Sequence, residues 1–506
     1  MSLAASIGIA SQSLVNINQN FGVISDNIAN ADTTGFATEQ ATQQSLAAGG
    51  IGYGVASGPI SLATSPALQA SLYEQNSEAA GSATTNAALG TLQPVLGAVG
   101  QGNDLGSLLG ALQNSFSALL NDPADQTQQG AVVGAAQNVA QQLNSLSAAY
   151  GSARQAAQDG LVSDVSTLNA ALATVGTLSQ QIVSLQAQGG STADLQNQRN
   201  AALTTISGLI NARFAPQPNG DMLVFSAGGA QLPTSGGTPL SISAANAGSG
   251  AYYPGGGLPG INLGNTDITA QLTGGSIGAN LTLRDQTLPT YQGEVDQFAQ
   301  TVATQFSAQG LTLFSDPQGN VPAGGGVPAQ SGYVGFAAAI TVNPAVVAQP
   351  SLVRDGTQAI AGSATGASAF TPNPSNLPGF ADMINRVLNF TFGTQIQSGV
   401  PQPSPVTTGL GPSGTLTAPF SAPSDLADFA TSITASQSAD SGNATAAAAD
   451  AQGTQTSLAN NLKAQTGIDV DSQLALMVQL QNAYGANAKI ISAVQDMFTS
   501  LLAAVT

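Results

Sequence analysis

Apolar residues near the start of the chain alternate steps of three and four, which is the spacing of a narrow coiled-coil seam. The seam consists of Ile7, Ala10, Leu14, Ile17, Phe21, Ile24, Ile28 and Ala31. Proline is absent from this stretch. The turn chemistry of Asp32, Thr33, Thr34 and Gly35 follows, so the pattern predicts one helix over residues 3–31 that ends there.

The end of the chain carries a second stripe with the same spacing. Its members are Leu474, Met477, Gln481, Tyr484, Ala488, Ile491, Gln495, Phe498 and Leu502. Asp471 and Ser472 are suited to cap the start of this helix. A lone helix with so narrow a stripe gains little stability, so we predict that the two ends pack on each other. For either stripe alone, the alternative is an amphipathic helix on an ordinary globular core.

A longer helical region lies between the two ends. Residues 86–210 have helical spacing, and one stripe in them comprises Leu161, Val165, Leu168, Leu172, Val175, Leu178, Ile182 and Leu185. Gly189 and Gly190 break this stripe. Ser191 with Asp194 then forms the pattern of a capping box, which predicts the start of another helix.

The pattern changes to strands and turns after residue 211. A Pro-Asn-Gly-Asp turn at residues 218–221 and the apolar run that follows it predict a hairpin. Residues 277–285 alternate and predict one more strand, whereas residues 310–424 are turn-rich with short β-like runs. Helical spacing returns in residues 425–465, and it is also present at Tyr291, Val295, Phe298, Val302 and Phe306.

These elements predict a multidomain α+β fold, with terminal coiled-coil helices and a helical-bundle stalk that carries inserted β-rich domains. The predicted terminal coiled-coil domain comprises residues 1–36 and 470–506. The predicted stalk comprises residues 37–210, 286–310 and 425–469, and the β-rich outer part comprises residues 211–285 and 311–424. Because helical segments begin and end the chain, both termini are expected at one end of the molecule.

Composition narrows the possible chemistry. The chain has no Cys and no His, which removes the usual ligands for zinc, copper and haem and the commonest general base. We therefore expect no metal, no cofactor and no enzymatic activity. A hydrolase that uses two carboxylates stays open as an alternative, although Asp221, Asp267 and Asp316 stand beside turn signals.

The charge balance and the hydropathy exclude two kinds of partner. Eight Lys and Arg stand against 26 Asp and Glu, and a net charge of −18 repels the phosphates of nucleic acids. No apolar run reaches the roughly 18 residues of a membrane span, so we expect no membrane insertion. The first basic residue is Arg154, so we expect any export to use a route without a cleaved signal.

The strings at both ends resemble one family. Residues 24–36 match an Asn-x-Ala-Asn core with a Thr-x-Gly-aromatic exit through Asn27, Ala29, Asn30, Thr34, Gly35 and Phe36. Residues 476–502 match an aromatic-x-Ala-Asn-Ala-Lys core through Tyr484, Ala486, Asn487, Ala488 and Lys489. Both strings are similar to those of flagellar axial proteins of the rod, hook and hook-associated class.

The middle of the chain resembles the hook-associated, junction-forming branch of this family. The resemblance is carried by residues 115–144, 194–232 and 340–356. Two details depart from that branch. Its usual Thr-Pro-Gly-Tyr exit is Thr-Thr-Gly-Phe here, and its Asp-Gln-Arg-Asp core is replaced by Asn197, Gln198, Arg199 and Asn200. These departures keep a hook or rod protein open as an alternative.

The resemblance implies a secreted structural subunit of the bacterial flagellum that forms the junction between hook and filament. It implies type III export and these partners: copies of itself in a ring, the hook protein, a second hook-associated protein and an export chaperone. The polymerisation residues it indicates are Ile7, Leu14, Phe21, Ile24, Asn27, Ile28, Asn30, Thr34, Gly35, Phe36, Leu474, Met477, Tyr484, Asn487, Ile491 and Phe498. For Asn27 and Asn30, capping of the helix end is an equally open role. An adhesin or a hydrolase on a helical stalk is the alternative from another class.

Overall fold

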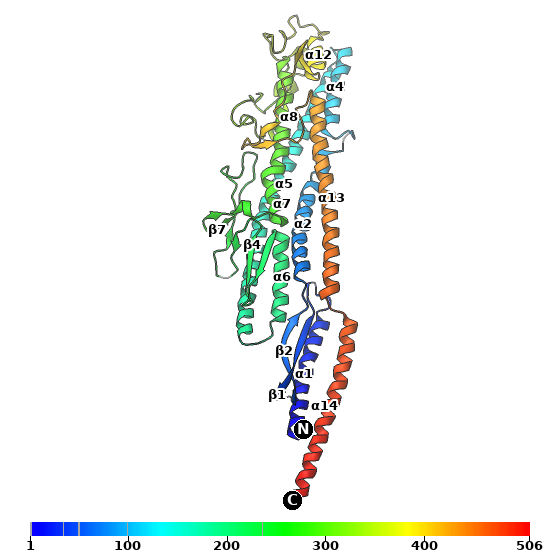
Figure 1. Ribbon diagram of the computed structural model, residues 1–506. Helices are drawn as coiled ribbons and strands as arrows, with labels where there is room; N and C mark the ends of the chain where they lie inside the picture. Colours follow the sequence, from blue (N-terminus) through cyan, green and yellow to red (C-terminus); the bar gives the residue numbers. More distant parts are fainter. Residues whose placement is uncertain (1–2, 34, 49–50, 99, 235, 506) are drawn as a thin grey trace.

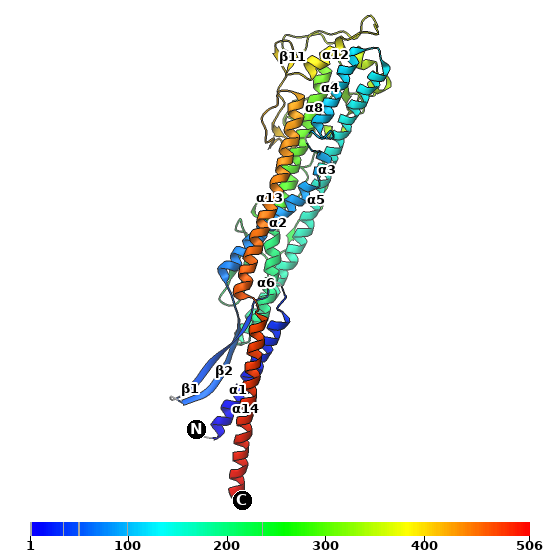
Figure 2. The same ribbon diagram turned by 90° about the vertical axis from the view of Figure 1, so that its right-hand side faces the viewer.

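The computed structural model describes the chain except for residues 1–2, 34, 49–50, 99, 235 and 506. The described residues form a long rod, and both chain ends lie at the same end of it (Figure 1). The short helices and loops of residues 336–392 lie towards the other end, as the perpendicular view in Figure 2 also shows. The predicted placement of both termini at one end is therefore confirmed.

Long helices run along the rod. The terminal pair is α1 (Leu3–Ala29) and α14 (Val470–Val505). The stalk contains α2 (Pro66–Gly90), α4 (Leu105–Asn121), α5 (Gln126–Ala187), α6 (Ala193–Leu209), α8 (Leu288–Ala308) and α13 (Leu426–Thr466). The shorter helices are α3 (Gln93–Leu96), α7 (Gly275–Thr282), α9 (Phe336–Ala339), α10 (Pro344–Ala348), α11 (Leu352–Asp355) and α12 (Asp382–Arg386). A 3-10 turn spans Thr269–Gln271, and π-helical turns span Leu283–Thr287 and Val387–Thr391.

Local sequence explains where these helices begin and end. The side chains of Asp104, Asp125 and Asp425 accept hydrogen bonds from backbone amides in the first turns of α4, α5 and α13. Pro66 begins α2, where its missing N–H costs nothing. Just beyond α5, Gly189 has a φ of 71°, a conformation that glycine adopts without strain.

Helix α5 is the spine of the stalk, because it contributes to two separate apolar cores. Its first half packs with α4, α8 and α13 around Phe116, Phe298 and Phe306. Its second half packs with α6, α7 and the neighbouring strands around Leu168 and Ile206. By length and composition α5 is also apolar enough to cross a membrane, but buried residues follow its whole length. It is therefore a core helix of the stalk.

The strands are short and form separate small sheets. The first sheet is a hairpin of β1 (Glu39–Ala48) and β2 (Ile51–Leu62). Two three-stranded antiparallel sheets follow, β3 (Ala212–Pro216), β4 (Met222–Ser226) and β5 (Gln231–Leu232), then β6 (Leu240–Ser241), β7 (Asn262–Leu263) and β8 (Thr266–Asp267). Pairs of very short strands complete the set: β9 (Phe314–Ser315) with β10 (Thr341–Val342), β11 (Gln395–Gln397) with β12 (Val400–Pro401), and β13 (Thr408–Leu410) with β14 (Leu416–Thr417).

Arginine side chains fasten the irregular segments to the helices. Buried Arg154 on α5 donates to the carbonyls of Arg284, Gly248 and Ala251 at 2.6–3.0 Å. Arg386 on α12 donates to the carbonyls of Gln309 and Ser368 at 3.1 and 2.9 Å. Burial lowers the pKa of Arg154 to about 10, so its guanidinium stays charged at neutral pH. The few basic residues of this acidic chain thus serve mainly inside the molecule.

One predicted helical range is partly a β-hairpin. Residues 39–62, assigned above to the stalk, form the β1–β2 hairpin beside α1 (Figure 2). The side-chain amide of Asn16 on α1 donates to the carbonyl of Val55 at 2.6 Å. The Gly49-Gly50 pair between two runs of alternating residues was the available signal, but Ala, Ser and Gln gave the strands little β character.

Two other local predictions are wrong. Residues 277–285 form α7 and the following π-helical turn, not a strand. The buried positions Ile277, Asn280 and Arg284 have helical spacing, and a short apolar run does not distinguish the two periods. The capping box at Ser191 is absent, because the residue that precedes α6 is Thr192, which makes no side-chain cap. At α14, Asp469 accepts from the amides of Asp471 and Ser472, so the capping residue lies two positions before the predicted Asp471.

Candidate assembly site: the terminal helix pair and its joint with the stalk

The two terminal helices lie side by side and run in opposite directions (Figures 1 and 2). Two side-chain hydrogen bonds fix their register. Asn27 donates to Gln473 at 3.2 Å, and Asn487 donates to Ser13 at 2.9 Å. Both helices advance by two heptads between these bonds, so the pairing stays in phase over this length. The predicted association of the two chain ends is therefore present.

The seam on α1 is the predicted one. Ala10, Ile17 and Ile24 are buried, and Ile7, Leu14, Phe21, Ile28 and Ala31 are half-buried. Val15, which lies off the seam, is 56% exposed. The predicted seam is thus covered, but Asn16 and Val23, which lie outside it, are buried as well.

The covered face of α14 differs from the predicted stripe. Its buried and half-buried positions in the contact with α1 are Gln473, Met477, Leu480, Ala483, Asn487, Ala488, Ile491 and Val494. Met477, Ala488 and Ile491 belong to the predicted stripe, but Leu474, Tyr484, Phe498 and Leu502 are exposed, as are Gln481 and Gln495. Several sets with this spacing can be drawn on so apolar a helix. The polar pairs with Asn27 and Ser13 select one of them.

Helix α14 therefore has a large uncovered apolar surface. Leu474, Val478 and Tyr484 are 46%, 55% and 44% exposed along the paired part. Towards the end of the helix, which extends past α1 in Figure 1, Leu501 and Leu502 are 59% and 64% exposed. Apolar patches of this kind on a folded chain mark interaction sites.

The motif after α1 divides into residues with different tasks. Asn27 is buried, and its carboxamide pairs with both backbone groups of Glu39 at 2.8 and 2.9 Å. Asn30 is half-buried and donates to the carbonyl of Asp26 at 3.0 Å, which is a bond at the helix end. Packing and capping, the two roles left open by the sequence, are thus divided between these residues. Thr34 lies outside the described residues.

The rest of the motif leads to residues 37–39, which connect the terminal pair to the stalk. Gly35 has a φ of 79°, a left-handed conformation that favours glycine. Phe36 is half-buried, and its amide donates to the carbonyl of Thr33 at 3.2 Å. The motif therefore turns the chain out of α1 and towards the stalk.

Three consecutive residues connect the terminal pair to the stalk. Asn197 on α6 pairs with both backbone groups of Ala37, at 3.0 and 3.1 Å. The amide of Thr38 donates to the carbonyl of Thr466 and its hydroxyl donates to the carbonyl of Gly467, both at 2.7 Å. Glu39 is held by Asn27 as described. The sequence did not indicate Asn197 or Gln473 as site residues, since neither belongs to an apolar stripe.

Acidic groups surround the joint. Burial raises the pKa of Glu39 above its usual value, and the carboxylates of Asp194 and Asp26 act in the same direction, whereas a hydrogen bond with Asn197 lowers it. Within the described residues, no group of three or more acidic side chains is arranged to hold a metal ion. The chemistry of this site is packing and hydrogen bonding.

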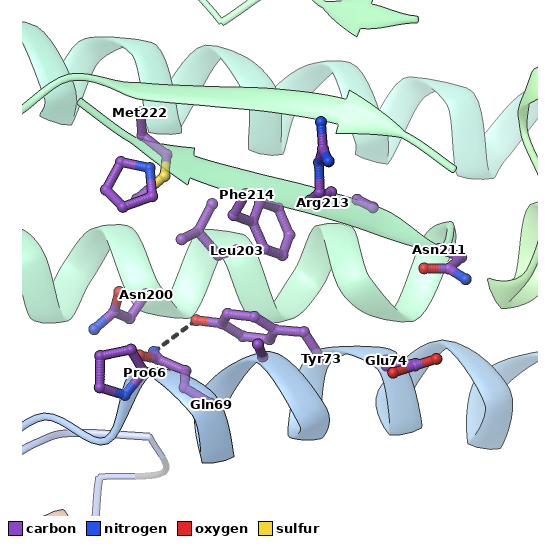
Figure 3. A pocket seen from close by; sticks show the side chains of 13 residues that line it. Pro66, Gln69, Tyr73, Glu74, Asn200, Leu203, Asn211, Arg213, Phe214 and Met222 are labelled. Atoms are coloured by element: carbon purple, nitrogen blue, oxygen red, sulfur yellow. Dashed lines mark hydrogen bonds between the residues drawn. The ribbon is translucent and has the colours of Figure 1, made fainter. Parts of the chain in front are cut away.

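A pocket with a volume of about 430 Å³ lies between α2, α6 and the β3–β4 hairpin. Figure 3 shows Tyr73 and Gln69 of α2 and Leu203 of α6 facing Phe214 and Met222 of the β3–β4 hairpin. The rings of Tyr73 and Phe214 meet edge to face at 4.9 Å, and Gln69 donates to the Tyr73 hydroxyl at 2.8 Å. Burial raises the pKa of Tyr73 to about 12, so this hydroxyl stays protonated. These contacts are those of a packed wall.

Comparisons with known proteins agree with this architecture. Residues 89–320 match the family model described as flagellar hook-associated protein FlgK helical domain, and residues 464–504 match that of flagellar basal body rod FlgEFG protein C-terminal. Both models describe axial proteins of the bacterial flagellum, a class of structural proteins. Within this class, the helical region of the chain matches the flagellar hook-associated protein FlgK family.

One solved structure with a similar chain is the flagellar hook junction protein FlgK from Burkholderia pseudomallei. The two chains are 23% identical with a TM-score of 0.41, and the match covers 50% of this chain and 46% of that one. The match thus spans about half the length of that protein. No curated protein sequence matches this chain.

Proposed function

We propose that this protein is a structural subunit of the hook–filament junction and that it polymerises through its terminal helices. The observation that carries the proposal is the α1–α14 pair at one end of the rod, whose α14 exposes Leu474, Val478 and Tyr484 beside its covered face. Copies of the same chain in a ring are the partner that this surface fits, because an apolar helix face is stabilised when neighbours cover it. The protein acts without catalysis.

The proposed neighbours follow from the position of a junction. The ring contacts the hook protein on one side and a second hook-associated protein on the other. The helical domain matched at residues 89–320 favours this role over that of a hook or rod protein, since it is described for the hook-associated family. The C-terminal model, described for rod and hook relatives, supports the shared terminal pair.

The proposed route and location belong to the same hypothesis. The subunit is exported by the type III apparatus and works in the extracellular flagellum. An export chaperone covers the apolar surface of α14 before export, because Leu501 and Leu502 are exposed in the free chain.

The acidic residues of the β-rich part give no support to a hydrolase. Asp267 accepts from the Thr269 amide and the Tyr253 hydroxyl, both at 2.9 Å. Asp316 accepts from the amides of Gln318 and Asn320 at 2.9 and 2.8 Å. Asp221 accepts from the Met222 amide. Each carboxylate is engaged in its own turn, as the turn signals predicted.

Immunogold electron microscopy of isolated flagella tests the proposal. Antibody against the stalk is expected to label one narrow band where the hook meets the filament. Label along the whole hook indicates a hook protein, and label along the filament or on the cell body contradicts the proposal. Hooks isolated from a strain that lacks the gene serve as the control for antibody specificity.

A further inference from the structure

Two asparagines that are distant in the sequence make the same contact on neighbouring residues. The side chain of Asn27 accepts from the Glu39 amide at 2.8 Å and donates to the Glu39 carbonyl at 2.9 Å. The side chain of Asn197 accepts from the Ala37 amide at 3.0 Å and donates to the Ala37 carbonyl at 3.1 Å. Both asparagines are buried, at 1% and 6% exposure. We call residues 37–39, held in this way, the elbow.

The two clamps come from different parts of the molecule. Asn27 lies on α1, in the terminal pair, and Asn197 lies on α6, in the stalk. Between them Thr38 is bound to the carbonyls of Thr466 and Gly467, where the chain leaves α13. The amide of Ala63, just after β2, donates to the carbonyl of Thr38 at 2.9 Å. Both crossings of the chain between the terminal region and the stalk, after β2 and after α13, therefore meet at the elbow.

The clamp on Glu39 is linked to the pairing of the terminal helices. The amide group of Asn27 that donates to Glu39 also donates to Gln473 on α14. The hydrogen bonds of the Asn27 side chain are therefore complete only when α14 is packed on α1. The pairing that we propose for assembly thus also fixes the first residue of the β1–β2 hairpin.

A carboxamide is the side chain that this geometry requires. It carries an acceptor and a donor in one plane, so it satisfies both the N–H and the C=O of one residue. Aspartate at this position only accepts when it is ionised. A carboxylate at position 197 also adds negative charge beside Asp194 and the buried Glu39.

We propose that Asn197 and Asn27 are positioning residues that set the direction of the terminal helix pair relative to the stalk. The proposal rests on the proposed function, because that direction decides how each stalk stands around the axis of the ring. The elbow then acts as a rigid connection, although short connecting segments between domains are commonly flexible.

A distance measurement on the full chain tests this role. The chain has no cysteine, so Asn18→Cys on α1 and Thr205→Cys on α6, both at exposed positions, give two unique sites for spin labels. Pulsed electron paramagnetic resonance of the labelled soluble chain is expected to give one narrow distance distribution. Asn197→Ala is expected to shift and broaden it, while the helix content and melting temperature of the stalk stay unchanged. Asn197→Asp, which keeps the acceptor, is expected to broaden it as well.

The control is Asn200→Ala, one turn along α6 and half-buried like the wall of the pocket around it. It is expected to leave the distance distribution unchanged. If Asn197→Ala fails to fold, Asn197→Asp and Asn27→Asp decide the question. If the distance distribution is the same in the Asn197 variants as in the native chain, the proposed positioning role of Asn197 is wrong. Because the measurement uses soluble protein, this result leaves the proposed junction role untouched, whereas gold label away from the junction contradicts that role and not the elbow.

Discussion

Asparagine and glutamine side chains determine the geometry of the terminal region. A buried amide costs free energy unless its donors and acceptors are paired. Asn27 meets this condition through Glu39 and Gln473, so each of these contacts supports the next. The apolar seam supplies attraction between α1 and α14, and the amides decide which faces and which register are used.

A charge on the α1 seam is expected to abolish assembly. Ile24 is 6% exposed, so Ile24→Asp places a carboxylate in a buried apolar contact at a cost of about 3 kcal/mol or more. The stalk cores contain no residue of α1, so circular dichroism is expected to show an intact stalk. Asn18→Asp, at an exposed position of the same helix, is the control.

Polymer formation by the Ile24→Asp variant, measured by sedimentation and negative-stain microscopy, decides this prediction. Assembly at the native level contradicts the packing argument. Loss of assembly together with loss of stalk structure shows a folding defect instead.

Glu294, in the stalk core, is expected to make stability fall as the pH rises. Burial raises its pKa from 4.5 to about 8, opposed by the hydrogen bond from Gln437 and reinforced by Asp440. The folded state therefore holds this proton more tightly than the unfolded state. The stabilising effect is full below about pH 4.5 and is lost as the pH rises through about 8.

Thermal melting of the native chain and of Glu294→Gln at about pH 6 and about pH 9 measures this effect. The free energy of unfolding of the native chain is expected to fall over this interval by an amount on the order of a few kcal/mol. Its melting temperature is expected to fall with it. The melting temperature of Glu294→Gln is expected to fall less. Some dependence on pH remains in this variant, because burial raises the pKa of Asp296 to about 7. Equal slopes in the two proteins contradict the assignment.

At the scale of elements, the sequence predicted the long helices and failed at short or small-residue segments. The seams of α1 and α5 repeat over many turns, so their period is unambiguous. Strand β1 is rich in Ala, Gln and Ser, and Gly and Pro interrupt the apolar residues of β2. The place of the hairpin depends on contacts such as that of Asn16 with Val55. Such contacts between distant segments leave no local pattern.

The connection between the terminal pair and the stalk also depends on contacts between distant segments, which the sequence did not predict. The motif around Asn27 was visible, but its partners on β1 and α14 were not, because they are distant in the sequence. Asn197 and Gln473 are single polar residues outside any stripe. Only the folded chain brings them to the elbow.

The uncovered face of α14 is expected to serve assembly alone. Val478→Asp and Leu474→Asp change side chains that are 55% and 46% exposed, so they remove apolar surface outside the covered face of α14. Sedimentation is expected to show loss of polymer, while cross-linking between α1 and α14 stays as in the native chain. Gln481→Asp on the same helix, at an exposed polar position, is a matched control for the added charge. Normal polymerisation of both apolar variants contradicts the role of this face.

For the whole molecule, the terminal pair is the least stable part. Both apolar cores belong to the stalk and the segments packed on it, and among the described residues neither core includes one of α1 or α14. A helix pair with one narrow seam opens at a lower free energy than such cores. Limited proteolysis of the soluble chain is therefore expected to remove both ends first and to leave a fragment of about residues 66–466. Early cleavage of the stalk with intact ends, detected by mass spectrometry, contradicts this order.

The junction role is tested most directly by electron microscopy of a strain that lacks the gene. The proposed function predicts cells with complete hooks and no attached filaments, and return of filaments when the native gene is restored. Cells without hooks point to a hook or rod protein, and cells with normal filaments contradict a structural role at the junction.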